Sequence, residues 1–574
     1  MMYIWKSVPE ADEMDIATLQ EQINVNSILA NILLQRGIKD FAEAKVFFRP
    51  DLKSLHDPFL MKDMDLAVER ILQAISNDEK ILIYGDYDVD GTTAVALLYS
   101  FLKTLHSKID YYIPDRYQEG YGISEKGVRY ASDEGFSLVI ALDCGIKAIE
   151  NVTLAKELSV DFIICDHHTP GEVLPPAVAI LDAKRKDCNY PYKELSGCGV
   201  GFKLSQAICR KLGKSEDILY PLLDLLVVSI AADIVPITGE NRTLAYFGLK
   251  QLNTSPRPGM QALIMAGKLG SDITISDIVF KIGPRINASG RLEHAGASVE
   301  LLISENLIEA EKLAKAVDIV NSTRRNFDEN ITREALEMIA TREEEREWNS
   351  TVLFKNDWHK GVIGIVASRC IEQYYRPTII LTESNGKATG SARSVVGFNI
   401  YNAISECSDL LEQFGGHKYA AGLTLSMDKV QEFQERFEEV VKVRIKEKHL
   451  TPVIEFDDEI KLDDVTPKFY SILKQMAPFG PGNPEPIFMF KNVYAENISV
   501  LKEKHIRFTI HQEGQDQSIV CLGFGMADPV KDQDRTTLGL LRSKIRFNML
   551  GEIRENVFRG NSSLQVYVKD IKFD

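Results

Sequence analysis

The sequence lacks the segments that mark membrane and secreted proteins. Among its 574 residues no apolar run is long enough to span a bilayer. The first residues, MMYIWKSVPEADEMD, turn acidic early and contain no signal-peptide core, so we expect a cytoplasmic protein. The eight cysteines form no CxxC pair, and Cys144, Cys165 and Cys521 lie in apolar stretches, which indicates reduced, buried thiols.

An excess of positive charge is also lacking. The chain holds 67 Lys and Arg residues against 83 Asp and Glu residues, a formal net charge of −16. This balance argues against a protein that coats nucleic acid with a broadly basic surface. It leaves room for an enzyme with an enclosed basic groove, because phosphate contacts need only a local concentration of charge.

No internal repeat or low-complexity linker divides the chain, yet its length is too great for a single core. Changes in the apolar pattern predict five segments. They are an N-terminal helical segment at 1–60, an α/β domain at 61–305, a connecting helix at 306–345, a second α/β domain at 346–447 and a β-rich domain at 448–574.

Short β-branched strands alternate with amphipathic helices in the first domain. The predicted strands are ILIY, IDYYIP, LVIALD, DFIICD and AVAILD. This alternation predicts a doubly wound, mostly parallel α/β sheet. From about Gly199 to Gly267 the pattern is helical.

The later segments repeat the α/β pattern once and then change to strands alone. The second α/β domain is predicted from three strands and two helices. The strands are TVLFKN, PTIILTES and ATGSARSV, and the helices are VIGIVASRCIEQYY and GFNIYNAISECSDLLEQF. Beyond residue 450, stretches such as PIFMFKNVYAENISVL, HIRFTIHQ and SLQVYVKDIKF alternate with turns. They predict a small β-barrel similar to an oligonucleotide-binding (OB) fold.

Carboxylates and imidazoles collect at the ends of the apolar stretches in the first domain. Such residues lie within or shortly after four apolar stretches, which are ILIY, LVIAL, DFIIC and LLDLLVVSIAADIVP. The residues, in chain order, are Asp86, Asp88, Asp90, Asp143, Asp166, His167, His168 and Asp233. Because the carboxyl ends of parallel strands meet at one edge of a sheet, we expect these side chains around a single crevice.

So many carboxylates cannot all be ionised in one site without a cation, because each raises the pKa of its neighbours. Mixed Asp and His ligands favour Mn²⁺ or a similar transition metal, whereas all-oxygen sites suit Mg²⁺. Two ions about 3.5–4 Å apart would support phosphoester hydrolysis. The sequence offers no competing Ser–His pair, reactive thiolate or Gly-rich Walker loop.

Each of these residues also has an ordinary structural interpretation. An Asp after a strand commonly forms a turn or a helix N-cap, and a His pair is commonly a surface or core feature. The DYDVD loop alone is compatible with a solvated acidic turn. Asp86, Asp88 and Asp90 nevertheless recur at alternate positions between two glycines, and ordinary explanations would have to hold at four separate segments. We therefore favour a metal site and treat Asp182, which ends AVAILD, as structural.

The same residues carry a family resemblance. GDYDVDG, ALDCG, CDHH and AADIVP resemble the four motifs of the DHH phosphoesterase superfamily, and GGHKYAAG resembles the signature of the DHHA1 domain. Five further segments resemble the RecJ branch of this superfamily, namely LHDPFLMKDMDLAVERI, PDRYQEGYG, GCGVGFK, IGPRINASGRL and GSARS. The likeness covers nearly the whole chain in the same order.

This resemblance implies a 5′-to-3′ exonuclease on single-stranded DNA that releases mononucleotides with Mn²⁺ or Mg²⁺ and serves DNA repair and recombination. It also implies single-strand-binding protein and a helicase as partners. The implied metal ligands, two ions in all, are Asp86, Asp88, Asp90, Asp143, His167 and Asp233. Asp143 would bridge, Asp86 would bind directly or orient another ligand, and His168 would contact the scissile phosphate or assist the leaving oxygen. Some relatives have His where this chain has Tyr84, so any metal contact from that position is absent here.

Candidate contacts to the strand come from Gly- and Arg-bearing segments. In the predicted loop IGPRINASGRLEHAG, Arg285, Asn287 and Arg291 would meet phosphates, although both arginines are equally compatible with ion pairs on an acidic surface. A pocket for a terminal 5′-phosphate is expected from Ser391, Arg393 and His417, and Arg116 in PDRY is a lesser candidate for the same path.

Two other functions are compatible with parts of this pattern. A phosphodiesterase on short oligonucleotides or cyclic dinucleotides, or a pyrophosphatase, would use the same metal chemistry, but those relatives are generally shorter and lack the terminal barrel. A non-catalytic replication scaffold would retain the fold without the ligands. Here every carboxylate motif is intact.

Overall fold

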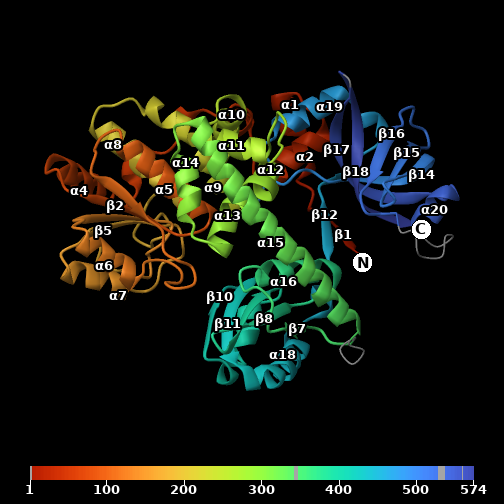
Figure 1. Cartoon of the computed structure of the whole chain (residues 1–574). Helices are drawn as coiled ribbons and strands as arrows, with labels where there is room; N and C mark the ends of the chain where they lie inside the picture. The colour runs from red at the N-terminus through yellow and green to blue at the C-terminus, as the bar shows by residue number, and fades with distance from the viewer. Residues whose placement is uncertain (1–2, 342–346, 528–536, 559, 574) are drawn as a thin grey trace. The chain divides into compact units, whose positions relative to one another are not determined.

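The structure is a computed structural model that describes residues 3–341, 347–527, 537–558 and 560–573 (Figure 1). It divides into two compact units, which we call the α/β unit (residues 55–452) and the barrel unit (residues 3–54 and 453–573). No helix in the described ranges is long and apolar enough to cross a membrane. All eight cysteines are buried and free, as predicted.

The first domain of the α/β unit contains a five-stranded sheet in the order β3-β2-β4-β5-β6, and every neighbouring pair is parallel. The strands are β2 (Ile81–Gly85), β3 (Ile109–Tyr112), β4 (Leu138–Leu142), β5 (Asp161–Cys165) and β6 (Ala179–Leu181). The central strands β2 and β4 are completely buried, which explains their unbroken apolar sequences.

Helices cover both faces of this sheet. On one face α6 (Glu125–Asp133) and α7 (Ile149–Glu157) pack their buried residues against β2, β4 and β5. On the other, α5 (Val89–Leu102) and α8 (Gly197–Lys211) contact β2 and β4, and α4 (Met64–Ser76) packs beside α8. The predicted doubly wound parallel sheet is confirmed.

A helical layer follows, as predicted. Its helices are α9 (Leu223–Ala232), α10 (Gly239–Thr254), α11 (Pro258–Ala266), α12 (Ile275–Asp277), α13 (Gly283–Leu292) and α14 (Gly296–Ile303). The predicted connecting helix is α15 (Leu307–Thr341), the long green helix of Figure 1. Residues 342–345 of that prediction lie outside the described ranges.

Two local predictions in this layer were wrong. The segment IGPRINASGRLEHAG, expected to be a loop, forms α13, whose Pro284 occupies the first turn of the helix, where a missing N–H costs nothing. The stretch before Asp233, grouped with the strands, is α9. A short, continuous apolar run is compatible with either a buried strand or a buried helix, so its composition does not decide between them.

The second α/β domain has a mixed sheet in the order β10-β11-β9-β8-β7. Its elements are β7 (Thr351–Phe354), α16 (Ile363–Gln373), β8 (Thr378–Ser384), β9 (Lys387–Arg393), α17 (Ile400–Ser405), β10 (Gln413–Gly416), β11 (Ala420–Ser426) and α18 (Val430–Arg444). The helix expected across 397–414 is only the short α17, because a 3₁₀ turn at Ser408–Leu410 and then β10 take up the rest.

The barrel unit contains a six-stranded sheet in the order β13-β14-β15-β16-β18-β17, and a further pairing of β14 with β17 closes the barrel. The strands are β13 (Asp458–Glu459), β14 (Phe488–Leu501), β15 (His505–Gln512), β16 (Ile519–Gly523), β17 (Phe547–Phe558) and β18 (Asn561–Phe573), with helices α19 (Pro467–Gln475) and α20 (Thr537–Arg542). The predicted OB-like barrel is confirmed.

The N-terminal segment belongs to the same unit. Strand β1 (Ile4–Ser7) pairs in parallel with β12 (Val453–Phe456). Helices α1 (Glu13–Ile23), α2 (Ser27–Gln35) and α3 (Phe41–Phe48) contribute Leu19, Leu29 and Phe47 to the apolar core of the barrel.

A buried ion pair joins α8 to α10 beneath the first sheet. Lys203 is fully buried, and its Nζ donates to Glu240 Oε1 at 3.1 Å and to the His56 carbonyl at 2.8 Å. Tyr190 donates to Glu240 Oε2 at 2.6 Å. Removing one partner from such a network leaves an uncompensated buried charge.

We predict that Glu240→Ala lowers the free energy of unfolding of the α/β unit by about 3–5 kcal/mol. The exposed pair Lys211–Glu69, with Nζ and Oε1 3.8 Å apart, provides the control, and Glu69→Ala should cost under about 1 kcal/mol. Urea denaturation followed by circular dichroism measures both. Equal losses in the two variants would contradict this account.

Candidate active site

The site lies at the carboxyl edge of the first sheet. The loop after β2 holds Asp86 and Asp88, and Asp90 falls in the first turn of α5. Asp143 directly follows β4, and Asp166, His167 and His168 directly follow β5. Because these three strands are parallel neighbours, their ends bring the loops together as predicted.

Asp233 reaches the same place from another layer. It is the C-cap of α9, and Ile234 after it adopts a left-handed conformation with φ of 59°, which ends the helix. Its carboxylate is therefore positioned by the packing of a helix and not by the sheet edge.

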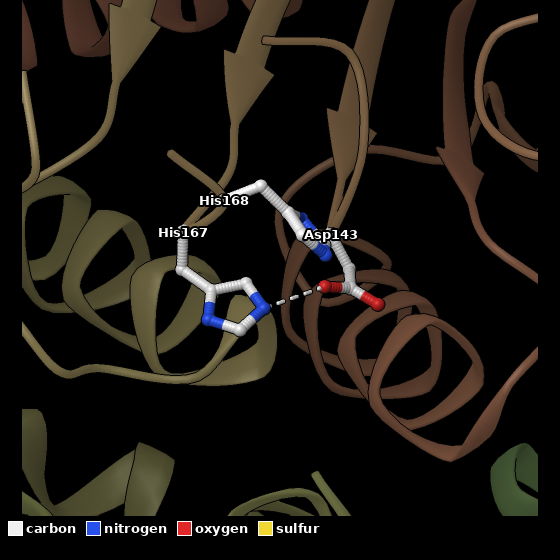
Figure 2. Close-up of side chains that lie close together, drawn as sticks. All are labelled: Asp143, His167 and His168. Carbon is white, nitrogen blue, oxygen red and sulfur yellow. Dashed lines mark ion pairs between the residues drawn. The ribbon is translucent and has the colours of Figure 1, made fainter. Parts of the chain in front are cut away.

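Three carboxylates surround one imidazole. His167 Nε2 lies 3.1 Å from Asp143 Oδ1, 3.6 Å from Asp233 Oδ2 and 3.7 Å from Asp90 Oδ2. Figure 2 shows the contact between His167 and Asp143 as a dashed line. Both side chains are almost completely buried, so bulk water does not screen the cluster.

Asp143 also belongs to a second group. Ligand atoms of Asp86, Asp88 and Asp143 all lie within 4.8 Å of one another, as do those of Asp90, His167 and Asp233. A third group joins Asp143 to His167 and His168. Asp143 therefore stands where two sets of ligand atoms meet.

Several buried polar atoms in the cluster lack a hydrogen-bond partner in the described ranges. They are Asp86 Oδ1, Asp143 Oδ1 and both ring nitrogens of His167. Buried polar atoms are rarely left in this state in native proteins unless an ion or ligand completes them. Carboxylate oxygens combined with imidazole nitrogen are the donor set that suits Mn²⁺, so the residues present fit a divalent cation.

The pKa values of the cluster also fit a site for a divalent cation. Burial, reinforced by neighbouring carboxylates, raises the pKa of Asp143 and of Asp86 well above the ordinary value. The same causes raise the pKa of Asp233 to about 8. Burial lowers the pKa of His167, which keeps its imidazole neutral and able to bind metal. A bound cation would offset the mutual repulsion of these carboxylates.

Asp90 is held in place by the start of helix α8. Its Oδ2 accepts from the Gly197 N–H at 2.7 Å, and its Oδ1 accepts from the Cys198 N–H at 2.8 Å and the Ser229 hydroxyl at 2.7 Å. The N-terminus of a helix stabilises such a negative charge.

Gly197 has a second role, because it allows Asp143 to approach. A Cβ atom at Gly197 would lie 2.6 Å from the Cβ of Asp143 and 2.7 Å from its Oδ1. Asp143 itself has φ of 59°, a left-handed conformation that costs free energy for a residue other than glycine. The site thus depends on close backbone packing between β4 and α8.

Asp166 positions His168. Asp166 Oδ1 accepts from His168 Nδ1 at 2.7 Å, and its Oδ2 accepts from the Ile146 N–H at 2.9 Å. Burial lowers the pKa of His168, but the hydrogen bond and charge of Asp166 outweigh it and raise the pKa above its ordinary value. His168 Nε2 faces away from Asp166 and lies 3.2 Å from the hydroxyl of Tyr121.

From sequence, Asp166 was expected at the crevice but given no role, and Tyr121 was not proposed as a site residue. Asp166 was recognised as part of its motif, but the contact that fixes the imidazole depends on side-chain rotamers. Tyr121 lies in PDRYQEGYG, far from His168 in sequence, and nothing local indicates that they meet.

The second domain contributes basic and polar groups. Arg393 Nη1 donates to Ser391 Oγ at 3.0 Å, and both side chains lie against Gly364 at the start of α16. Arg291 Nη1 donates to the Gly361 carbonyl at 3.1 Å, which joins α13 to the segment before α16. Burial, with the charges of Arg116, Arg324 and Arg393, lowers the pKa of Arg291 to about 10.

Other predicted contacts are placed as follows. The Arg116 guanidinium lies 5.0 Å from the ring centroid of Tyr87 in the acidic loop. His417 and His168 line a common cavity of about 520 Å³. Asn287 is half-buried on α13. Arg285 Nε donates to Asp318 Oδ1 at 2.9 Å, so its charge is already paired within the protein.

Tyr84 is buried in the apolar core between the sheet, α6 and α7. Its hydroxyl donates to the Gly122 carbonyl at 2.9 Å and accepts from the Ser124 N–H at 3.1 Å. This side chain therefore serves packing, and the ring of Tyr112 stacks against it with the ring centroids 5.4 Å apart.

Family models match three successive parts of the chain. Residues 80–230 match the N-terminal domain of the DHH family, residues 349–443 match the DHHA1 domain and residues 456–570 match the RecJ OB domain.

Comparison with individual proteins extends over nearly the whole chain. The chain is 37% identical to the single-stranded-DNA-specific exonuclease RecJ of Bacillus subtilis, over 98% of this chain and 70% of that protein. It is 31% identical to RecJ of Escherichia coli, over 95% of each. Its structure is similar to that of Thermus thermophilus RecJ in complex with Mn²⁺, with a TM-score of 0.84 and 26% identity over 100% of this chain and 80% of the other.

We predict that Mn²⁺ affinity rises with pH. In the metal-free protein Asp233 keeps its proton up to about pH 8, and the cation has to displace it. A raised carboxyl pKa also means that the metal-free fold loses stability as pH climbs from about 4 towards that value. Mn²⁺ should therefore raise Tm more at pH 8 than at about pH 6. Differential scanning fluorimetry measures this, and a shift independent of pH would contradict it.

We further predict that Gly197→Ala weakens Mn²⁺ binding by about 10- to 100-fold, because the added Cβ displaces Asp143. Gly270 has no atom within 4 Å of the position of an added Cβ, so Gly270→Ala is the control and should bind Mn²⁺ normally. Isothermal titration calorimetry measures both. Unchanged affinity in Gly197→Ala would show that Asp143 binds no ion.

Proposed function

The chain belongs to the RecJ family, and from this premise we propose that it is a single-strand-specific DNA exonuclease that releases 5′-mononucleotides from the 5′ end. The observation that carries the proposal is the cluster of carboxylates and imidazoles in which Asp143 belongs to two of the three groups of ligand atoms. Relatives named as single-stranded-DNA-specific exonucleases, and RecJ structures in complex with Mn²⁺ and Mg²⁺, support it.

We propose that two divalent ions bind here. Asp86, Asp88 and Asp143 offer one ligand group, and Asp90, His167 and Asp233 offer the other. Asp143 Oδ1 lies 3.1 Å from His167 Nε2, which puts this carboxylate within reach of both groups. When bound, the ions would supply the Lewis acidity for phosphodiester hydrolysis.

The protein's own groups then handle the proton and the strand. His168, held through Nδ1 by Asp166, carries a proton at Nε2 for the leaving 3′-oxygen of the terminal nucleotide or for the scissile phosphate. Each cut leaves a new 5′-phosphate on the shortened strand. A pocket built from Arg116, Ser391 and Arg393 would therefore work in every round.

The pocket also accounts for attack at an end. His417 and His168 line one cavity, so a terminal nucleotide would be enclosed beyond the catalytic edge. The barrel unit is the natural place for more distant contacts to a long strand, because OB folds bind single strands. A role in repair and recombination, and binding to single-strand-binding protein and a helicase, stay predictions.

The experiment uses single strands labelled at either end, with and without Mn²⁺. We expect mononucleotides from the 5′ end only when metal is present, and no release by Asp143→Ala. Asp133→Ala, which changes an exposed carboxylate at the end of α6, is the matched control and should be fully active.

A loss under tenfold in Asp143→Ala, or about 1.4 kcal/mol of barrier, would contradict a bridging role for this residue. Degradation of dinucleotides without degradation of long strands would instead favour the phosphodiesterase of short substrates.

A further inference from the structure

One face of the connecting helix α15 carries the side chains that pack against the rest of the α/β unit. Its buried residues recur three or four positions apart, the spacing that places side chains on one face of a helix. They include Ala310, Ala314, Val317, Asn321, Asp328, Ile331 and Ala335. Arg324 falls on this same stripe, between Asn321 and Asp328, and is half-buried.

The domain that this face of α15 contacts changes at Arg324. Before it, Asp318 accepts from Arg285 of α13 at 2.9 Å. After it, Asp328 accepts from Arg369 of α16 at 2.8 and 2.9 Å, one bond to each oxygen. These contacts lie about 9 Å and about 6 Å from Arg324 along the helix axis. Arg324 therefore faces the junction between the two α/β domains.

The charge of Arg324 is only partly offset in the described part of the chain. The carboxylate one turn away, Asp328, already uses both oxygens for Arg369. Arg324 Nε is buried and has no hydrogen-bond partner among the described residues. Polar atoms buried in this way are costly unless a ligand completes them.

Further positive charges converge on the junction. Arg291 bridges it by donating to the Gly361 carbonyl, and its pKa falls under the influence of burial and of Arg116, Arg324 and Arg393. Burial also lowers the pKa of Arg324. Several guanidinium groups in one poorly solvated place repel one another, and an anion between them would relieve this.

The backbone next to Arg291 is close to the catalytic loop. A Cβ at Gly290 would lie 2.6 Å from the carbonyl oxygen of Tyr87, which is flanked by Asp86 and Asp88. An anion held at the junction therefore belongs to a molecule that also reaches the metal ligands. A nucleic-acid strand has phosphates at regular intervals and meets this requirement.

We propose that Arg324 is a phosphate-binding residue on the connecting helix, which together with Arg291 holds a phosphate group of the single strand at the junction of the two α/β domains. This inference rests on the proposed function and adds α15 to the path of the strand. The phosphate is either the 5′-terminal group or a backbone phosphodiester, and both present the same oxygens to a guanidinium.

The test compares Arg324→Gln and Arg324→Lys with Arg325→Gln. Arg325 is the matched control, because its side chain is 61% exposed and its Nη2 lies 3.8 Å from Glu329 on the same helix. Binding of a fluorescent single strand is measured by anisotropy over a series of salt concentrations in the Asp143→Ala background, where the strand stays intact.

We expect Arg324→Gln to weaken binding by about tenfold and to reduce the slope of log K against log salt by about 0.7, the value for one lost contact to a single strand. Arg324→Lys should keep the slope and lose part of the affinity. Arg325→Gln should match the parent protein in both. In the active enzyme, Arg324→Gln should raise KM and leave kcat nearly unchanged.

Strands with a 5′-phosphate and with a 5′-hydroxyl separate the two sources. A loss confined to phosphorylated strands identifies the terminal group, and a loss on both identifies the backbone. An unchanged salt slope in Arg324→Gln would overturn the proposal, whatever the change in Tm. If the parent protein neither bound nor degraded single strands, the proposed function itself would fail, which is a different result.

Discussion

The structure depends on the repulsion between carboxylates that the fold forces together. Asp86 and Asp143 are buried, Asp233 beside Asp143 is half-buried, and each of the three has a pKa raised above its ordinary value. A fold selected for stability alone would replace such a cluster with apolar residues, because unpaired buried charge is costly. The cluster makes physical sense when divalent cations complete it, and the surrounding architecture is arranged to keep it intact.

The contacts that keep the carboxylate cluster intact are local. Parallel strands bring three loops to one edge, α8 presents its N-terminal N–H groups to Asp90, and Gly197 lets Asp143 approach in a left-handed backbone conformation. Asp166 then fixes the second imidazole, His168, outside the buried group. The same unit gathers several guanidinium groups, among them Arg291 and Arg393, where its second domain meets the first. Cation-binding and anion-binding regions thus lie next to each other, as cutting a polyanion requires.

Much of this was predictable from sequence, and the exceptions have physical causes. Strand ends after short apolar runs are local features, so the positions of Asp143 and His167 followed from the pattern alone. Asp233 was placed near them correctly but on the wrong element, since a continuous apolar run does not distinguish a buried helix from a strand. The α13 helix was missed because glycines and a proline usually interrupt helices, whereas here Pro284 begins one. Nothing local in the sequence distinguishes Arg324 from the other charges of this long helix, because its partial burial depends on two domains packing together.

The central claim is that these acids and imidazoles hold divalent cations. Crystals soaked in Mn²⁺, with diffraction recorded at the manganese absorption edge, test it most directly. The account predicts two anomalous peaks about 3.5–4 Å apart, with Asp143 between them and His167 bound to one. A map without anomalous density among Asp90, Asp143, His167 and Asp233, in a protein that still degrades single strands, would contradict it.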